Sequence, residues 1–317
     1  MELAIIIILG ILFLLFILFT ILSLYLIFTS FVRTSNARDN FLGYVSHLRK
    51  KGREDEANLM AEGLIQLEDM PTEDVWITSY DGLKLHGVLL PSKTGENKTA
   101  ILVHGYRNEW KYEFAAIWSY YYQNGWRILF IEHRSHGKSE GKYITFGVRE
   151  RFDLCGWVNE MKMKFGEDNR IVAHGISMGA ATVMMAQSMP QIAGKLSAFV
   201  ADCGFVSPEQ EFRHQFKAMH LPTYPLIWIA NILTKCICGF FFGEASASDA
   251  LEKATVPALF IHGEDDDFVP TISSHINYEK CASSKTLFLV PKARHADAYL
   301  VDKMGYEKHL DKLYARL

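Results

Sequence analysis

The sequence predicts an α/β fold: a mostly parallel, eight-stranded sheet with helices on both faces, a helical cap and an N-terminal transmembrane helix. The first observation behind this prediction is the Asp81-Gly82 turn between two short segments, 75–78 and 83–89, which is typical of a β-hairpin. The second is a series of six apolar runs separated by amphipathic stretches of helical length, which indicates parallel strands joined by helices. The third is a long apolar stretch that precedes both.

That apolar stretch runs from Leu3 to Val32 without a charged residue. At ~1.5 Å per residue, a helix of this length crosses the ~30 Å hydrocarbon core of a bilayer with residues to spare. A signal peptide is the alternative, but it would carry a basic region before a shorter apolar stretch, and only Glu2 precedes this one. Residues 1–34 are therefore predicted to form a retained, single-pass membrane anchor.

The charges on the two sides of the span predict its orientation. Basic residues follow it, whereas nothing basic except the terminal amine precedes it, so the positive-inside rule places the rest of the chain in the cytoplasm. The five cysteines agree, because their number is odd and no C-x-x-C pair is present, which favours free thiols and a reducing compartment. The basic residues are Arg33, Arg38, Arg49, Lys50, Lys51 and Arg53.

The remainder divides into a connector and one α/β domain. Apolar residues recur at helical spacing over 35–72, which predicts helices lying on the domain or on the membrane surface. Strand and helix patterns alternate over 73–317, and in parallel sheets of this kind chemistry gathers at the carboxyl ends of the strands. Buried strands are expected at 99–103, 127–131, 170–173, 197–201, 257–261 and 286–290.

One insertion interrupts this alternation. Residues 205–250 contain no strand pattern but many large apolar side chains. We expect a helical cap over the carboxyl edge of the sheet, beginning with Ser207 as N-cap, Pro208 in the first turn and Gln210 at the reciprocal capping position. A membrane-dipping hairpin is the alternative, although the apolar run 225–233 is too short to span a bilayer.

The composition excludes some classes of function. The formal net charge is −3, so no basic surface argues for nucleic acid. The Cys236-x-Cys238 pair is too tight for the usual zinc spacing, and nothing in the sequence indicates a metal or an organic cofactor. The oligomeric state is not predicted.

A candidate nucleophile lies in the stretch H-G-I-S-M-G-A at 174–180. Ser177 stands between Gly175 and Gly179, at the end of one expected strand and the start of a helix, which is the context that G-x-S-x-G requires. The glycines let strand and helix approach closely, and the helix N-terminus favours developing negative charge near the hydroxyl.

A nucleophilic serine needs a base, an orienting acid and donors for the oxyanion. His295 follows the last expected strand, and four consecutive acids, Glu264 to Asp267, follow the strand before it. This is the chain order expected for such a triad. Asp202, after the strand at 197–201, is an alternative acid. The N–H groups of Tyr106 and Met178 are the expected oxyanion donors.

These residues resemble the α/β-hydrolase superfamily over about 73–317. The closer likeness is to its serine-aminopeptidase-like and lysophospholipase-like branch, including membrane-anchored bacterial members. The H-G-x-x-D-x-x-V-P pattern at 262–270 selects Asp266 as the acid, with Asp265 and Asp267 as alternatives. The usual D-x-R-G-H-G-x-S appears as E-H-R-S-H-G-K-S, so Glu132 and Ser135 are departures outside the triad. The motifs are His104-Gly105-Tyr106, 132–139, 175–179, 262–270 and His295.

The resemblance and the apolar cap together predict a membrane-anchored serine hydrolase of acyl esters or thioesters, lipid-like or small. We expect the substrate pocket to include Phe205, Phe212, Tyr224 and Trp228. A serine aminopeptidase is the alternative enzyme, and a sensor or binding module with this fold is the alternative outside catalysis. An aminopeptidase would need an anionic site, for which Glu132, Glu209 and Glu211 are candidates. His133 and His136 have metal-like spacing, but a role in loop structure is favoured.

Overall fold

The computed structural model describes residues 1–34 and 36–317 and contains one eight-stranded sheet with the order β1-β2-β4-β3-β5-β6-β7-β8. β1 and β2 form the predicted hairpin, β2 also pairs antiparallel with β4, and every other neighbouring pair is parallel. The predicted sheet is confirmed. Its strands are β1 (Glu73–Thr78), β2 (Lys84–Leu90), β3 (Lys98–Val103), β4 (Arg127–Ile131), β5 (Arg170–Ile176), β6 (Ala198–Asp202), β7 (Ala258–Gly263) and β8 (Lys285–Val290).

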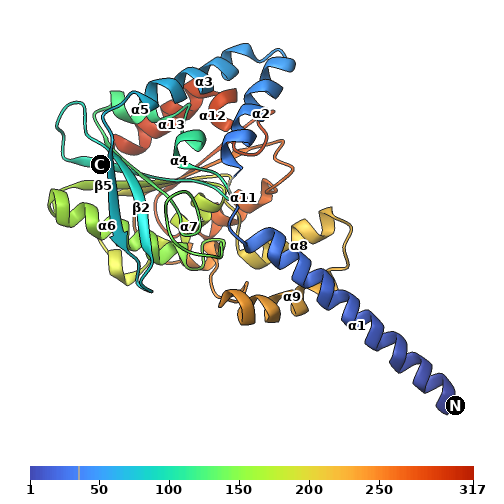
Figure 1. Ribbon diagram of the computed structural model, residues 1–317. Helices are drawn as coiled ribbons and strands as arrows, with labels where there is room; N and C mark the ends of the chain where they lie inside the picture. The colour runs from blue at the N-terminus through green and yellow to red at the C-terminus, as the bar shows by residue number, and fades with distance from the viewer. Residues whose placement is uncertain (35) are drawn as a thin grey trace.

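Helices cover both faces of this sheet (Figure 1). Along β5 the side chains alternate between the faces: Ile171 and Ala173 join one apolar cluster, and Val172 joins the other. The first cluster includes α6, α7, α10 and α11, and the second includes α4, α5, α12 and α13. These helices are α4 (Trp110–Glu113), α5 (Trp118–Gln123), α6 (Glu150–Phe165), α7 (Met178–Ala186), α10 (Ala247–Leu251), α11 (Ile272–Lys280), α12 (Ala298–Val301) and α13 (Lys303–Tyr314), with a 3-10 turn at Pro190–Ile192.

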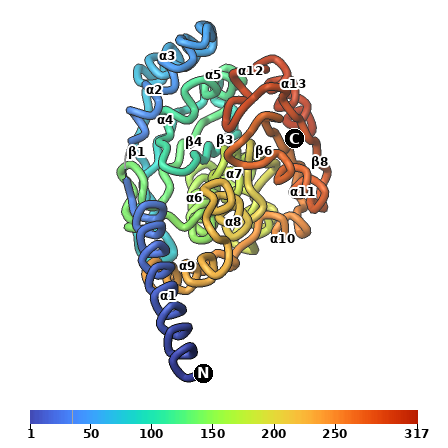
Figure 2. Tube along the Cα trace, turned by 90° about the vertical axis from the view of Figure 1, so that its right-hand side faces the viewer, coloured from blue at the N-terminus to red at the C-terminus, as the bar shows by residue number. Residues whose placement is uncertain are grey.

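The apolar N-terminal stretch forms α1 (Glu2–Phe31), most of which projects from the α/β domain (Figures 1 and 2). Within the described residues, it is the one helix long and apolar enough to cross a membrane. Its buried residues lie toward its C-terminal end, where Ile27 is 0% and Phe31 3% exposed. The Phe31 ring lies 5.4 Å from the rings of Phe146 and Phe212, so the end of α1 belongs to the core of the domain.

Two helices follow where the connector is predicted, α2 (Ala37–Lys50) and α3 (Glu54–Glu68). They lie over α4 and α5 (Figure 1). Tyr44 Oη donates to Asp297 Oδ1 at 2.6 Å and Arg53 pairs with the same carboxylate at 2.8 Å, which ties these helices to the loop after β8. The predicted connector starts at residue 35, which lies outside the described residues.

The predicted cap consists of α8 (Pro208–Ala218) and α9 (Thr223–Cys238), inserted between β6 and β7. Ser207 is the N-cap of α8, as predicted, and its hydroxyl accepts the backbone N–H of Gln210 at 3.2 Å. α9 packs beside α1 in both views (Figures 1 and 2). The cap and the C-terminal end of the apolar helix therefore adjoin at one edge of the domain.

Candidate active site

Ser177 occupies a sharp turn between β5 and α7, with φ +55° and ψ −118°. Such a conformation is rare for a residue with a side chain and is characteristic of a functional turn. A Cβ on Gly179 would lie 1.9 Å from the carbonyl oxygen of Val103, and one on Gly175 would lie 2.2 Å from that of Gly179. The two flanking glycines are therefore required by the close approach of β3, β5 and α7.

The loops after β7 and β8 bring the predicted acid and base to this serine. His295 Nε2 lies 2.9 Å from Ser177 Oγ, and His295 Nδ1 lies 2.7 Å from Asp266 Oδ2. The other carboxylate oxygen, Asp266 Oδ1, accepts the backbone N–H groups of Phe268 and Val269 at 3.0 and 2.9 Å. Serine, histidine and aspartate thus form a continuous hydrogen-bonded chain in which the acid is held by its own loop.

The same geometry distinguishes Asp266 from the other acids considered. Asp265 and Asp267 are exposed, and Asp267 pairs with Arg294 at 2.7 Å. Asp202 is buried at the end of β6 but receives the hydroxyl of Tyr306 at 2.9 Å rather than the imidazole of His295. Among these four carboxylates, Asp266 is the one hydrogen-bonded to the base.

Local charges hold this pair in the protonation states that a triad needs. Burial by itself raises the pKa of Asp266, but hydrogen bonds from His262 and His295 outweigh it, so the pKa falls well below its usual range. Burial lowers the pKa of His295, and its hydrogen bond and charge interaction with Asp266 more than offset this, so the net shift is upward. Asp266 is therefore a permanent anion facing an imidazole of increased basicity.

The predicted oxyanion donors lie on two loops beside Ser177. Met178 is the first residue of α7, and Tyr106 follows β3. No hydrogen bond joins either backbone N–H to an acceptor in the described part of the chain, so both remain available to a bound group. Both amides are therefore free to serve as the predicted oxyanion donors, a role that preorganised backbone N–H groups can fill.

Buried histidines hold the loop that carries Tyr106. His136 Nε2 accepts the N–H of Arg107 at 3.1 Å, and His104 Nε2 accepts the N–H of His133 at 3.1 Å. Burial lowers the pKa of His104 to about 3 and that of His136 to about 4, so both stay neutral and can accept. The His133 side chain also holds the loop, because its Nε2 lies 3.0 Å from the carbonyl oxygen of His104, so the loop role favoured for His133 and His136 is confirmed.

A cavity of about 220 Å³, here called the apolar cavity, opens beside Ser177. Its walls come from the cap and from α1, which contributes Leu26 and Ser30. The sequence did not predict the contribution of α1, although the apolar stretch is longer than a membrane span requires, which was a signal that its end could pack against the domain. Other lining residues are Tyr106, Phe146, Met178, Phe205, Glu211, Phe212, Gln215, Phe216, Met219, Phe268 and Val269.

Two of the four predicted pocket residues line this cavity, Phe205 and Phe212, and two do not. The prediction for Tyr224 and Trp228 is wrong: these side chains are 56% and 61% exposed and their rings contact each other at 5.3 Å on the outer side of α9. The inner side of α9 carries Leu226 instead, which is 0% exposed. The first half of α9 is almost entirely apolar, so its sequence gives little sign of which side faces inward.

The three acids considered as anionic sites have different surroundings. Glu132 is 4% exposed and its carboxylate is occupied by His86 and by the N–H of Lys138, at 2.9 and 2.5 Å. Glu209 pairs with Arg213 at 2.6 Å. Glu211 alone lines the apolar cavity, where burial raises its pKa to about 7.

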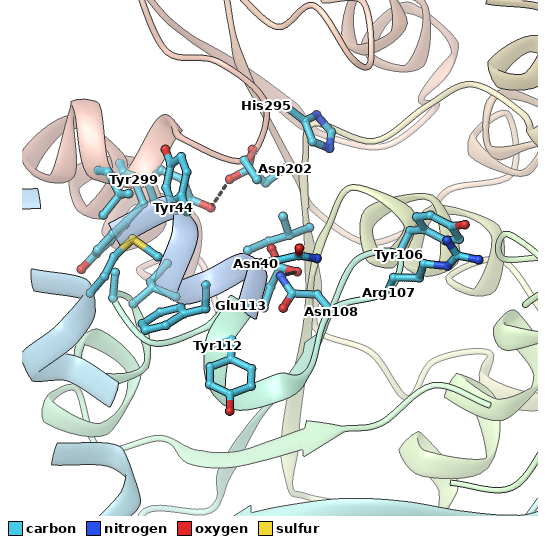
Figure 3. Close-up of a pocket in the computed structure, with 18 residues that line it drawn as sticks. Asn40, Tyr44, Tyr106, Arg107, Asn108, Tyr112, Glu113, Asp202, His295 and Tyr299 are labelled. Carbon is cyan, nitrogen blue, oxygen red and sulfur yellow. Dashed lines mark hydrogen bonds between the residues drawn. The ribbon is translucent and has the colours of Figure 1, made fainter. Parts of the chain in front are cut away.

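A second cavity, of about 250 Å³, lies beside His295 and is here called the polar cavity. Two carboxylates that the sequence analysis did not assign to a pocket, Glu113 and Asp202, line it together with residues of α2 (Figure 3). Tyr106 borders both cavities. Ser177 therefore borders an apolar space, and His295 borders a space that holds two acids.

A metal fits this site less well than a triad does. Among the described residues, Cys203, Asp266 and His295 form the one group whose possible ligand atoms lie within 4.8 Å of one another. Burial raises the pKa of the Cys203 thiol well above its usual value, which keeps it protonated and a poor ligand. Asp266 and His295 already bond to each other, and all five cysteines are free of disulfides.

Comparison with known proteins identifies the fold. No family model matches the chain. Protein YqkD of Bacillus subtilis is 33% identical over 185 residues, which are 58% of this chain, and the chain spans only 60% of that relative. Similar solved structures include Pyrococcus furiosus esterase Pf2001, which is 24% identical, with 79% of this chain and 93% of that one covered at a TM-score of 0.64. They also include acetyl xylan esterase 1 of Thermoanaerobacterium sp., which is 15% identical, with 83% and 93% covered at a TM-score of 0.58. Sheet topology, turn geometry and these likenesses agree: the chain has the α/β-hydrolase fold.

Proposed function

We propose that this protein is a membrane-anchored serine hydrolase that cleaves carboxylic esters through an acyl-enzyme. The observation that carries the proposal is the hydrogen-bonded chain from Ser177 Oγ through His295 to Asp266, at 2.9 and 2.7 Å, beside two free backbone amides. The esterases among the similar structures support an ester as the substrate.

The geometry supports an ordinary two-step reaction. His295 Nε2 takes the proton of Ser177 as Oγ attacks the ester carbonyl, while the amides of Tyr106 and Met178 bind the oxyanion. The C–O bond to the alcohol then breaks, and His295 delivers the proton to the departing oxygen. Water attacks the acyl-Ser177 ester by the same base catalysis and releases the acid. Asp266 holds the imidazole tautomer and stabilises the imidazolium throughout.

Membrane anchoring by α1 is part of the proposal. If α1 were a signal peptide, its cleavage would remove Ile27 and Phe31 from the core and Leu26 from the wall of the apolar cavity. Retention of α1 is therefore favoured, because cleavage would open the site and expose apolar surface. The basic residues after α1 support a domain on the cytoplasmic side.

A lipid-like acyl group suits the apolar cavity. Its wall of phenylalanine, methionine and leucine side chains is continuous with the end of a helix that spans the bilayer in this proposal. Tyr224 and Trp228, which α9 exposes beside α1, are residue types enriched at membrane interfaces. An acyl chain could thus pass from the bilayer surface to Ser177 along one apolar path.

An amide hydrolase is the second candidate, and Glu211 is the observation that favours it. This carboxylate lines the same cavity as Ser177 and could receive a substrate amino terminus. Its raised pKa, about 7, weakens that case near neutral pH, because a half-protonated acid attracts an ammonium group poorly. Aminoacyl amides compared with acyl esters of equal length would decide between the two.

The test of the proposed function is covalent labelling of the detergent-solubilised full chain with a fluorophosphonate, read by intact mass. One adduct is expected, and it should be lost in Ser177→Ala and His295→Ala but kept in Ser284→Ala, which alters an exposed serine. Ester turnover should fall by about 10³-fold or more in the first two variants. Absence of an adduct on a folded wild-type chain would favour the sensor or binding module instead.

A further inference from the structure

The polar cavity contains two carboxyl groups that the proposed reaction does not use. Glu113 and Asp202 line it within one space of about 250 Å³, and neither is part of the triad. Asp202 ends β6, and its backbone carbonyl accepts the N–H of Ser177 at 2.8 Å. These acids therefore lie beside the reacting centre rather than at a remote surface.

Asp202 holds an unsatisfied buried oxygen. Its residue is 2% exposed; Oδ2 accepts the Tyr306 hydroxyl at 2.9 Å, whereas Oδ1 has no hydrogen-bond partner in the described part of the chain. Burial raises its pKa to about 6, so the group is a carboxylate above that pH. A buried carboxylate oxygen without a partner is costly, and its presence in a cavity wall points to a cationic ligand that offsets its charge.

Glu113 brings the second carboxylate close to Ser177. Its Oε2 accepts the Gly105 N–H at 3.1 Å and the Asn108 side-chain amide at 2.6 Å, while Oε1 receives no hydrogen bond from the described residues. A Cβ on Gly105 would lie 3.3 Å from Glu113 Oε2 and 3.4 Å from Ser177 Cβ. The acid and the nucleophile thus flank the same glycine.

The positive charges at the cavity do not neutralise this pair. Arg107 donates to the carbonyl oxygens of Thr29 and Val32 at the end of α1, and its guanidinium stacks over the Tyr106 ring at 4.9 Å. Figure 3 shows Tyr106 and Arg107 on the side away from Asp202. His295 is the other basic group in the wall, and Asp266 holds it.

Aromatic rings complete the wall. Tyr44 of α2, Tyr299 of α12 and Tyr306 of α13 lie on the Asp202 side, as Figure 3 shows for the first two. Carboxylates together with aromatic faces are the usual protein surroundings of an alkylammonium ion, which carries its charge on an apolar surface. Metal ions are a poorer match, because the described lining holds two carboxylates and otherwise amide and phenol oxygens beside apolar side chains.

We propose that the polar cavity is the leaving-group site and that it binds the ammonium group of an amino-alcohol ester, with quaternary or protonated nitrogen beside Glu113 and Asp202. The inference rests on the proposed function and names the alcohol half of its substrate. The acyl chain then occupies the apolar cavity and the ester lies at Ser177. In acylation the Ser177 Oγ–carbon bond forms, the carbon–oxygen bond to the amino alcohol breaks, and the serine proton passes through His295 to that oxygen; the ammonium charge is unchanged.

The first test compares hexanoylcholine with neohexyl hexanoate, an ester of the same shape in which carbon replaces the charged nitrogen. The wild-type chain in an uncharged maltoside detergent should favour the choline ester by about tenfold in kcat/KM, which corresponds to 1.4 kcal/mol. Glu113→Gln should reduce this ratio severalfold, and Glu62→Gln, an exposed acid on α3 outside the cavity, should keep it. Equal hydrolysis of both esters by the wild-type chain overturns the proposal and leaves the esterase intact.

A second test separates the two proposals. Titration calorimetry of Ser177→Ala with choline chloride measures the site without turnover, with neohexanol as the neutral probe. Saturable choline binding that is lost in the double variant with Glu113→Gln supports the site even if no ester is cleaved, in which case only the proposed function fails. No choline binding to a variant that melts like the wild-type chain overturns the leaving-group site.

Discussion

The two cavities beside Ser177 are similar in volume, about 220 and 250 Å³, but are built from different parts of the molecule. The apolar cavity takes much of its wall from α1 and from the cap, both of which lie outside the sheet, and the rest from loops beside Ser177. The polar cavity takes its carboxylates from the end of β6 and from α4 after β3, with α2 beside them. The strands of the sheet and the loops after them therefore position Ser177, His295 and Asp202. The helices α1, α2 and α8 shape the space for the two halves of a substrate.

The largest effect on kcat is expected from a substitution of Asp266, the acid that is hydrogen-bonded to His295. Asp266→Asn keeps the size of the side chain but removes the anion that fixes the His295 tautomer, so kcat should fall by about 10⁴-fold. Because acylation needs the same base for every ester, steady-state rates of charged and neutral esters should fall by the same factor. Exposed Asp265→Asn is the control. A loss confined to one ester class would place Asp266 in substrate binding instead.

The part of the pH dependence that His295 sets should be common to both ester classes, whereas protonation of Asp202 near pH 6 should weaken only the binding of the charged ester. His295 must be neutral to take the serine proton, and its pKa is raised above the ordinary 6.5. The acid limb of kcat/KM should therefore lie above pH 6.5, with a loss of about tenfold per pH unit below it. The charged His295–Asp266 pair stabilises the folded state fully below pH 6.5, and this stabilisation is lost as the pH rises through the pKa of His295 in the folded state. Activity therefore rises with pH where this contribution to stability falls. A limb below pH 6 would contradict the assignment of the base.

The sequence predicts the sheet and the residues around Ser177 much better than it predicts the walls of the two cavities. The sheet, the Ser177 turn and the acid and base loops follow from local patterns, since each strand run and each motif lies within ten or so residues. The walls of the cavities do not. α1 is apolar on every side, so nothing local shows that Leu26 faces the cavity while Leu18 is 57% exposed. Glu113 and Asp202 meet only because β3 and β6 flank β5 in the sheet.

A substitution on α1 tests the origin of the apolar cavity. Leu26→Trp should fill part of it and lower kcat/KM for an octanoyl ester by about tenfold relative to an acetyl ester, since each excluded methylene loses about 0.8 kcal/mol of burial. The charge preference of the polar cavity should stay the same. Leu18→Trp, on the projecting part of the same helix, is the matched control. Equal chain-length profiles in the two variants would remove α1 from the acyl site.

The smallest effect concerns Glu211, the acid of the apolar cavity. Its pKa is about 7 in the folded chain against an ordinary 4.5, so between these pH values the folded state keeps a proton that the unfolded state has released. The free energy of unfolding should fall across this window as pH rises, and the loss should persist above it. Glu211→Gln can keep the hydrogen-bond partnership with Gln215 but has no proton to lose.

Thermal unfolding in detergent should therefore give similar Tm values for Glu211→Gln and the wild-type chain at pH 5, and a variant more stable by a few °C at pH 8. This corresponds to about 1–3 kcal/mol for a side chain that is 5% exposed. Glu264→Gln, at an exposed acid in the loop after β7, should give no such divergence. Parallel Tm curves for Glu211→Gln and wild type would show that Glu211 ionises freely, and the apolar cavity would then carry a full negative charge. An amino terminus would in that case be as good a fit to the acyl side as an alkyl chain.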